Sequence, residues 1–138
     1  MIIKQISIFI ENKPGRLAEI TDIIAKNNIN LRALSIADTA NFGILRIIAE
    51  EASKAEKILK DNGIAVSITS VISICVQDRP GGLAEILKKL AEHNIDVGYM
   101  YAFVSKQSGE AYVIMRIEED FRAMEILTNA GYKGLDIE

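Results

Sequence analysis

Residues 10–20 read IENKPGRLAEI, and the closely similar stretch VQDRPGGLAEI stands 66 positions later, at 76–86. Each copy has an apolar run in front of it, a polar turn that ends in Pro-Gly, and an amphipathic run behind it. Residues 10–31 and 76–97 share nine identities in 22 positions. Because a repeat of this length indicates duplication, the chain is predicted to contain two copies of one small domain.

The composition places the chain among globular proteins. Of its 138 residues, 49% are hydrophobic and 25% are charged, which argues against disorder. The net charge of −3, without a basic half, argues against a nucleic-acid partner. No apolar run approaches the roughly 20 residues needed to span a membrane, and the N-terminus is not a signal peptide, so the expected compartment is the cytoplasm. The single cysteine, Cys75, excludes an internal disulfide and a cysteine-cluster metal site, and no cofactor is expected.

Hydrophobic spacing divides each copy into the same six elements, with a period of two for strands and of about 3.6 for helices. The first copy is predicted to have a strand at 4–10, a helix from 16 to about 27, strands at 30–37 and 43–49, a helix at 52–62 and a strand at 64–68. The second is predicted to have a strand at 71–77, a helix at 82–93, strands at 96–104 and 110–117, a helix at 120–130 and a strand at 132–137.

All four helices are predicted to end at an Asn or a Gly, because these residues tolerate the left-handed conformation found past a helix end. An apolar residue follows in each case and supplies the contact that usually accompanies such an end. The four pairs are Asn28-Ile29, Gly63-Ile64, Asn94-Ile95 and Gly131-Tyr132.

This order of elements predicts an α+β protein with two tandem ferredoxin-like βαββαβ domains, at residues 1–69 and 70–138. Each domain would have an antiparallel sheet with both helices on one face. Apolar residues at both parities of several strands indicate that the other face is also apolar and is buried against a partner. Together with the exposed strand edges, this pattern predicts a homodimer.

The sequence resembles a tandem pair of ACT domains, which are small regulatory modules that bind amino acids. The resemblance rests on residues 12–17 and 78–83 (NKPGRL and DRPGGL) and on the triplets at 28–30 and 94–96. It covers essentially the whole chain and leaves no catalytic domain. The resemblance implies a stand-alone regulator whose partners are a free amino acid, as effector, and an enzyme of amino-acid metabolism.

The first Pro-Gly turn has the chemistry of a carboxylate site. Pro14 and Gly15 form the turn, and Gly15 lets the backbone approach a ligand closely. The following helix is expected to present unpaired N–H groups at Gly15, Arg16 and Leu17, at the positive end of the helix dipole. This arrangement favours a bound carboxylate.

Asn12 precedes the turn and Asn30 begins the next strand, so these two amides are expected on either side of the same pocket. An amide both donates and accepts, so the pair could serve the ammonium and the carboxylate of one zwitterion. The resemblance implies the same role for both residues. In family members that sense serine, a His stands two positions before the residue that matches Asn12. Ile10 and Val76 occupy these positions here, which favours an apolar effector side chain.

The second copy keeps the turn at Gly81, Gly82 and Leu83 but replaces both amides with acids, Asp78 and Asp96. A carboxylate only accepts hydrogen bonds, so it could hold an ammonium but would repel a carboxylate. The second copy is therefore expected either to have lost its site or to complete a shared site at the domain interface.

Other interpretations remain open from the sequence. The Pro-Gly pairs could be plain turns and the two Asn residues locally bonded, which would leave a ligand-free oligomerisation or interaction module. A small enzyme is a weaker hypothesis, because the sequence has no Ser-His or Cys-His pairing and no phosphate-binding glycine motif. Cys75 is expected to be a buried, inert thiol, and His93 to lie at a helix end.

Overall fold

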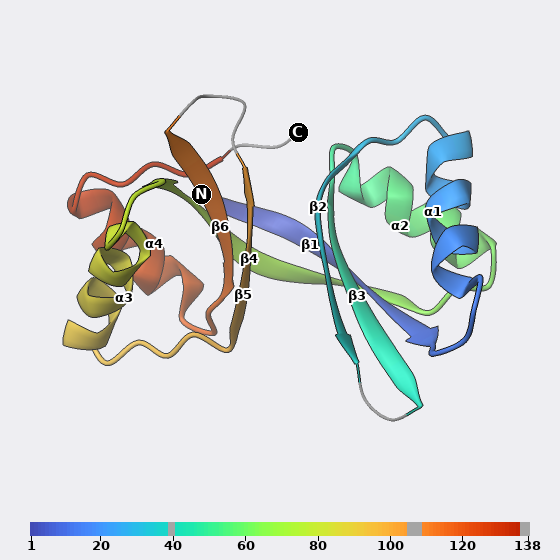
Figure 1. Cartoon of the computed structure of the whole chain (residues 1–138), viewed down its shortest axis with the longest axis horizontal. Helices are drawn as coiled ribbons and strands as arrows, with labels where there is room; N and C mark the ends of the chain where they lie inside the picture. Colours follow the sequence, from blue (N-terminus) through green and yellow to red (C-terminus); the bar gives the residue numbers. More distant parts are fainter. Residues whose placement is uncertain (39–40, 105–108, 136–138) are drawn as a thin grey trace. The chain divides into compact units, whose positions relative to one another are not determined.

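The computed structural model describes residues 1–38, 41–104 and 109–135, and no helix among them is long and apolar enough to cross a membrane. Six strands and four helices are found in these residues (Figure 1). In chain order they are β1 (Ile2–Glu11), α1 (Arg16–Lys26), β2 (Leu31–Asp38), β3 (Phe42–Ala49), α2 (Ala52–Asp61), β4 (Val66–Gln77), α3 (Gly82–Glu92), β5 (Tyr99–Val104), β6 (Glu110–Arg116) and α4 (Asp120–Asn129). The strands are hydrogen bonded in the order β2-β3-β1-β4-β6-β5.

The chain divides into two compact units. The first-repeat unit is Lys4–Thr69, and the second-repeat unit combines Met1–Ile3 with the described residues from Ser70 onward. Strands β1 and β4 therefore each contribute to both units. Strand β3 pairs antiparallel with β1 and with β2, and β6 pairs antiparallel with β4 and with β5. This confirms the predicted α+β class built from two repeats.

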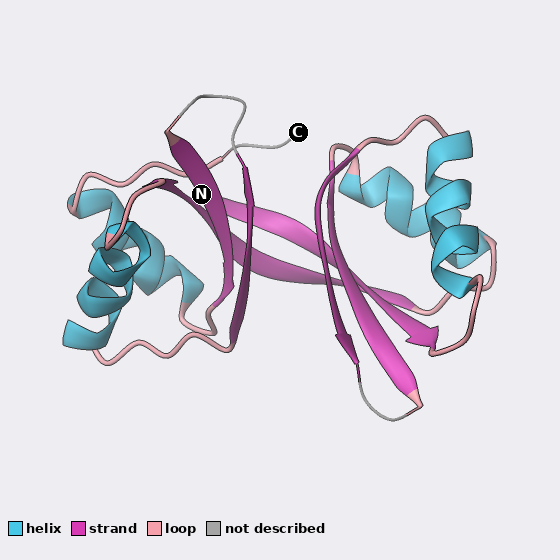
Figure 2. Ribbon diagram, viewed as in Figure 1, coloured by secondary structure: helices cyan, strands magenta, loops and turns pink. Residues whose placement is uncertain are grey.

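Each unit has its own apolar core between its strands and its two helices, which lie on one face of those strands (Figure 2). Alternate residues of β1 face the first core, and residues four apart on α1, Ile20 and Ile24, meet them there. The same spacing recurs in α3, where Ile86 and Leu90 are buried. The repeat in the sequence is thus a repeat of core positions.

The four helix ends follow the prediction. Asn28 and Asn94 have φ values of 58° and 55°, and Gly63 and Gly131 have values of 74° and 92°. In each case the N–H of the next, apolar residue donates to a carbonyl in the last turn of the helix. These bonds are Ile29 to Ile24 at 3.3 Å, and Ile64 to Leu59, Ile95 to Leu90 and Tyr132 to Leu127, each at 3.0 Å. This pattern satisfies carbonyls that a helix end would otherwise leave unpaired.

Three strand predictions were wrong, the first being the strand expected at 96–104, which begins only at Tyr99. The strands expected at 64–68 and 71–77 form one strand, β4, which continues through Thr69 and Ser70. Residues 132–135 are not a strand, and residues 136–137 lie outside the described part of the chain. The expected last strand is absent because β1 begins earlier than expected, and Met1 accepts a hydrogen bond from the N–H of Ser73 in β4 at 2.7 Å. The C-terminal segment keeps one bond to β4, from the N–H of Cys75 to the carbonyl of Lys133, at 2.7 Å.

The contact between the N-terminal segment and the C-terminal segment predicts the effect of one substitution. A Cβ at Gly134 would lie 2.4 Å from Cα of Met1 and 2.7 Å from the carbonyl oxygen of Ser73. Gly134→Ala should therefore lower the free energy of unfolding by about 1–3 kcal/mol, the usual cost of overpacking. Urea unfolding followed by circular dichroism measures it.

The matched control is Gly98→Ala, because a Cβ there would make only an ordinary contact, 3.4 Å from the carbonyl oxygen of Arg116. Equal unfolding midpoints for the two variants would contradict this close packing of Met1 against Gly134.

Candidate functional site

The two Pro-Gly turns have the same left-handed glycine. Gly15 and Gly81 have φ values of 84° and 87°, a conformation that glycine adopts readily. The carbonyl of each glycine accepts a bond from the N–H four residues later, at 3.0 Å, as the first helix of the repeat begins. An added Cβ at Gly15 would meet nothing within 4 Å, so the turn is open on that side.

The helix N-termini are less free than the sequence suggested. The N–H of Arg16, expected to be unpaired, lies 3.4 Å from the carbonyl oxygen of Lys13, and the N–H of Gly82 donates to the carbonyl of Arg79 at 3.0 Å. The turn itself supplies these acceptors, because it folds back on the start of the helix. Of the flanking leucines, Leu17 is 37% exposed, whereas Leu83 packs against the second core.

Asn12 and Asn30 are both exposed, and one unit does not bring them together. The N–H of Asn12 donates to the carbonyl of Asn41 at 3.3 Å, next to the start of β3. The side chain of Asn30 donates to Glu50 at 3.3 Å, just past the end of β3. The eight residues of β3 lie between Asn41 and Glu50, which separates these positions by roughly 30 Å, at about 3.3 Å per residue.

Strand topology explains this separation. Strands β1 and β2 are both antiparallel to β3, so they run parallel to each other. The end of β1 and the start of β2 therefore lie at opposite ends of the strands. The expectation of a single pocket flanked by both amides within one unit is wrong. The exposed acids of the second repeat are separated in the same way. The N–H of Asp78 donates to the carbonyl of Gly109, next to the start of β6. Asp96 stands two residues before Gly98, whose N–H donates to the carbonyl of Arg116 at the end of β6.

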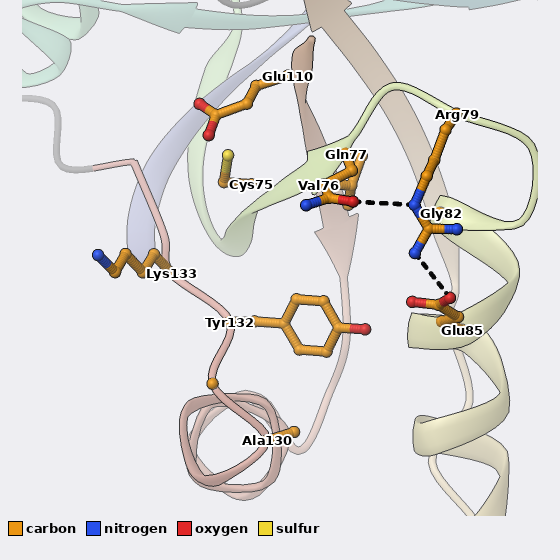
Figure 3. A pocket seen from close by; sticks show the side chains of 11 residues that line it. Cys75, Val76, Gln77, Arg79, Gly82, Glu85, Glu110, Ala130, Tyr132 and Lys133 are labelled. Carbon is orange, nitrogen blue, oxygen red and sulfur yellow. Dashed lines mark hydrogen bonds and ion pairs between the residues drawn. The ribbon is translucent and has the colours of Figure 1, made fainter.

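A cavity of about 450 Å³ lies beside the second Pro-Gly turn, within the second-repeat unit (Figure 3). It is bounded by the end of β4, the start of α3 and the segment that follows α4. The sequence-based prediction included only Gly82 among the lining residues. The polar side chains that it missed are Gln77, Arg79, Glu85, Glu110, Tyr132 and Lys133.

Gly82 lines this cavity and is required by the turn. A Cβ at this buried position would clash with the carbonyl oxygen of Gln77, so only glycine fits the turn as folded. The residue 66 positions earlier is Arg16, whose side chain is only 23% exposed and whose Nη1 binds Glu19 at 3.0 Å. In the second repeat Arg79 reaches the matching acid, Glu85, at 2.9 Å from the other side of the turn. The difference between Arg16 and Gly82 was the signal in the sequence that could have located the cavity.

Cys75 is half-buried on the cavity wall rather than fully buried. Burial, followed by a hydrogen bond to Glu110 and the charge of that carboxylate, raises the pKa of the thiol. The thiol is therefore protonated at neutral pH and is a poor nucleophile. His93, whose Nδ1 lies 3.0 Å from the carbonyl oxygen of Lys89, is at a helix end. Within residues 1–38, 41–104 and 109–135, no cluster of His, Cys, Asp and Glu could hold a metal ion.

Comparison with known proteins identifies the fold and the family. Protein BT0572 from Bacteroides thetaiotaomicron is 44% identical, with a TM-score of 0.92 over 98% of this chain and 92% of that one. The regulatory subunit of aspartate kinase from Thermus thermophilus, in a ligand-free form, is 14% identical, with a TM-score of 0.66 over 94% of this chain and 97% of that one. The corresponding Thermus flavus subunit is 13% identical, with a TM-score of 0.64 over 95% of each chain.

At these low identities the likeness to the aspartate kinase subunits is one of fold. None of the curated proteins matches the sequence significantly. A family model described as an ACT domain pair matches residues 1–134, which include both Pro-Gly turns and both sets of helices. The chain therefore belongs to the family of ACT domain pairs.

Proposed function

We propose that the chain is a regulatory protein that binds a free amino acid at its first Pro-Gly turn and thereby modulates a partner enzyme of amino-acid metabolism. The observation that carries the proposal is the first turn, where a left-handed glycine precedes a helix N-terminus in a member of the ACT domain pair family. The fold shared with regulatory subunits of aspartate kinase is consistent with a regulatory role.

The first turn has three features suited to the effector. The backbone at Gly15 is uncovered, so a carboxylate can approach it and the positive end of the α1 dipole. The exposed amide of Asn12 stands just before the turn. Ile10 is apolar where serine-sensing members have His, which favours an aliphatic or aromatic effector.

An effector held by both predicted amides would require two copies of the chain. Within one copy Asn12 and Asn30 lie at opposite ends of β3, so one copy would supply Asn12 and another would supply Asn30. A homodimer is the simplest assembly of this kind. Strand β2 is at the end of the strand order, and on it Leu34 and Ile36 are 52% and 45% exposed, as expected of an edge that pairs with a second copy.

An amino acid with an aliphatic or aromatic side chain should raise the melting temperature. For dissociation constants from micromolar to millimolar, binding free energies are about −4 to −8 kcal/mol. At a hundredfold excess over the dissociation constant, linkage gives about 2.7 kcal/mol, a shift on the order of 5–10 °C. A thermal-shift panel of the common amino acids measures it. If none moves the midpoint at millimolar concentration, the ligand-free interaction module becomes the better interpretation.

Gly15→Val should abolish the response to that amino acid, because the branched side chain blocks approach to the backbone. Its folding cost should be only about 1–2 kcal/mol, since the left-handed φ is the only obstacle. Gly63→Val is the matched control: Gly63 also has a positive φ, with nothing within 4 Å of an added Cβ, but it follows α2. Calorimetric titration of both variants compares them. Equal binding by the two would show that the effector does not use the first turn.

Asn12→Ala and Asn30→Ala should each weaken binding by about 1–3 kcal/mol, the cost of an unpaired polar group on the ligand. If two copies share the site, then mixing the variants should restore wild-type affinity at part of the sites. The intact sites would take Asn12 from one variant and Asn30 from the other. Light scattering should give a homodimer.

The titrations of the separate and mixed variants, after exchange of subunits, give the affinities. A monomer at high concentration, or no restoration in a mixture that exchanges, would contradict the shared site.

A further inference from the structure

We propose that the cavity beside the second Pro-Gly turn is a further amino-acid site, in which Glu110 binds the ammonium group and Lys133 binds the carboxylate of the ligand. The ligand class rests on the proposed function, but the site is a different one and uses none of the amides predicted from the sequence. Its volume of about 450 Å³ lies within the range of pockets that hold small molecules.

The charged side chains around the cavity lie at its two ends, two at each end (Figure 3). Arg79 binds Glu85 at 2.9 Å and the side-chain oxygen of Gln77 at 2.9 Å, so that its charge is already compensated. At the other end, Glu110 and Lys133 flank Cys75, and the ring of Tyr132 lies between the two ends. Within the described part of the chain, neither Glu110 nor Lys133 has an ion pair.

One half-buried carboxylate and one ammonium are thus available to a ligand. A zwitterion can satisfy both at once, because its ammonium faces Glu110 and its carboxylate faces Lys133. A simple anion would leave the half-buried Glu110 without a partner of opposite charge, although the thiol of Cys75 is hydrogen bonded to it. Removing a charged group from water is favourable only when it is paired, so Glu110 favours a ligand with an ammonium group, and the exposed Lys133 adds a weaker preference for a carboxylate on the same ligand.

The first repeat provides an internal comparison, because it lacks each feature. In the first repeat the N–H of Phe9 donates to the carbonyl of Ala65 at 3.0 Å. In the second repeat the N–H of Cys75 donates to the carbonyl of Lys133 in the same way. Ala65 thus takes the place of Lys133. In the first repeat Glu11 at the end of β1 pairs with Phe42. At the matching place in the second repeat, Gln77 at the end of β4 pairs with Glu110. Arg16 stands at the position of Gly82. The glycine, the acid and the base of this cavity therefore occur together only in the second of the two repeats.

Cys75 makes occupancy of this cavity measurable, because it lies on the cavity wall and is the single cysteine of the chain. The common amino acids, added one at a time, should include at least one that slows labelling of the thiol severalfold at mildly alkaline pH. The experiment uses the full chain carrying Gly15→Val, so that the first turn does not contribute.

Calorimetry on the same background then tests the two charged groups. Glu110→Gln should weaken binding of the protecting amino acid about tenfold or more, because it removes a half-buried charge partner. Lys133→Met should weaken it less, because the exposed ammonium is screened by water. The controls Glu125→Gln and Lys88→Met remove the same charges from exposed helix positions and should leave the affinity unchanged.

Each result decides between the two proposals. Protection of Cys75 that is lost in Glu110→Gln and retained in the controls supports the site. A thermal shift in the wild-type chain without protection of Cys75 overturns this site and leaves the proposed function standing. Protection that survives in both Glu110→Gln and Lys133→Met also overturns it. If no amino acid either stabilises the wild-type chain or protects the thiol, both proposals fail.

Discussion

The left-handed glycine after each proline is the constraint on which the rest of the structure depends. With φ values of 84° and 87°, Gly15 and Gly81 reverse the chain from a strand into a helix within a few residues. This reversal sets the first helix of each repeat on one face of its strands, where Ile20 and Ile86 reach the two cores. The same reversal leaves backbone uncovered at the helix start. The turn therefore fixes the packing of the repeat and also produces the surface proposed to bind the effector.

The two repeats share this left-handed glycine but differ around it. In the first, Arg16 binds Glu19; in the second, Gly82 stands at the position of Arg16, and Arg79 binds Glu85 instead. A guanidinium thus reaches the same glutamate position from opposite sides of the turn. Duplicated domains that keep their core positions are free to change the residues around a turn, which permits two different sites on one fold.

The sequence predicted most of what depends on local interactions. The helices ended at Asn28 and Asn94 as expected, because a left-handed Asn followed by an isoleucine is a local signal. It did not predict the continuity of β4, because Thr69 and Ser70 look like a polar link although both are compatible with a strand. The pairing of Met1 with Ser73 depends on residues far apart in the chain, and no local pattern encodes it.

The candidate site was only partly predictable, for two reasons. Glycine at position 15 permits a positive φ, which is a property of the residue type, but the separation of Asn12 and Asn30 follows from topology. In the βαββαβ order, β1 and β2 run parallel, so that their opposite ends bear the two amides. The identities between the repeats do not indicate the cavity, because its residues differ between them. Gly82 stands at the position of Arg16, and the polar residues Glu110 and Lys133 have no counterpart in the first repeat.

The proposed function requires an amino acid to bind at the first Pro-Gly turn. Nuclear magnetic resonance of the isotope-labelled chain, titrated with the amino acid that stabilises it, measures this residue by residue. We predict that the amide signals of Gly15 and Arg16 shift along one saturable binding curve, while that of Gly63, at a left-handed turn elsewhere in the same unit, does not move. Saturation of the protein with no shift at the first Pro-Gly turn would contradict this function.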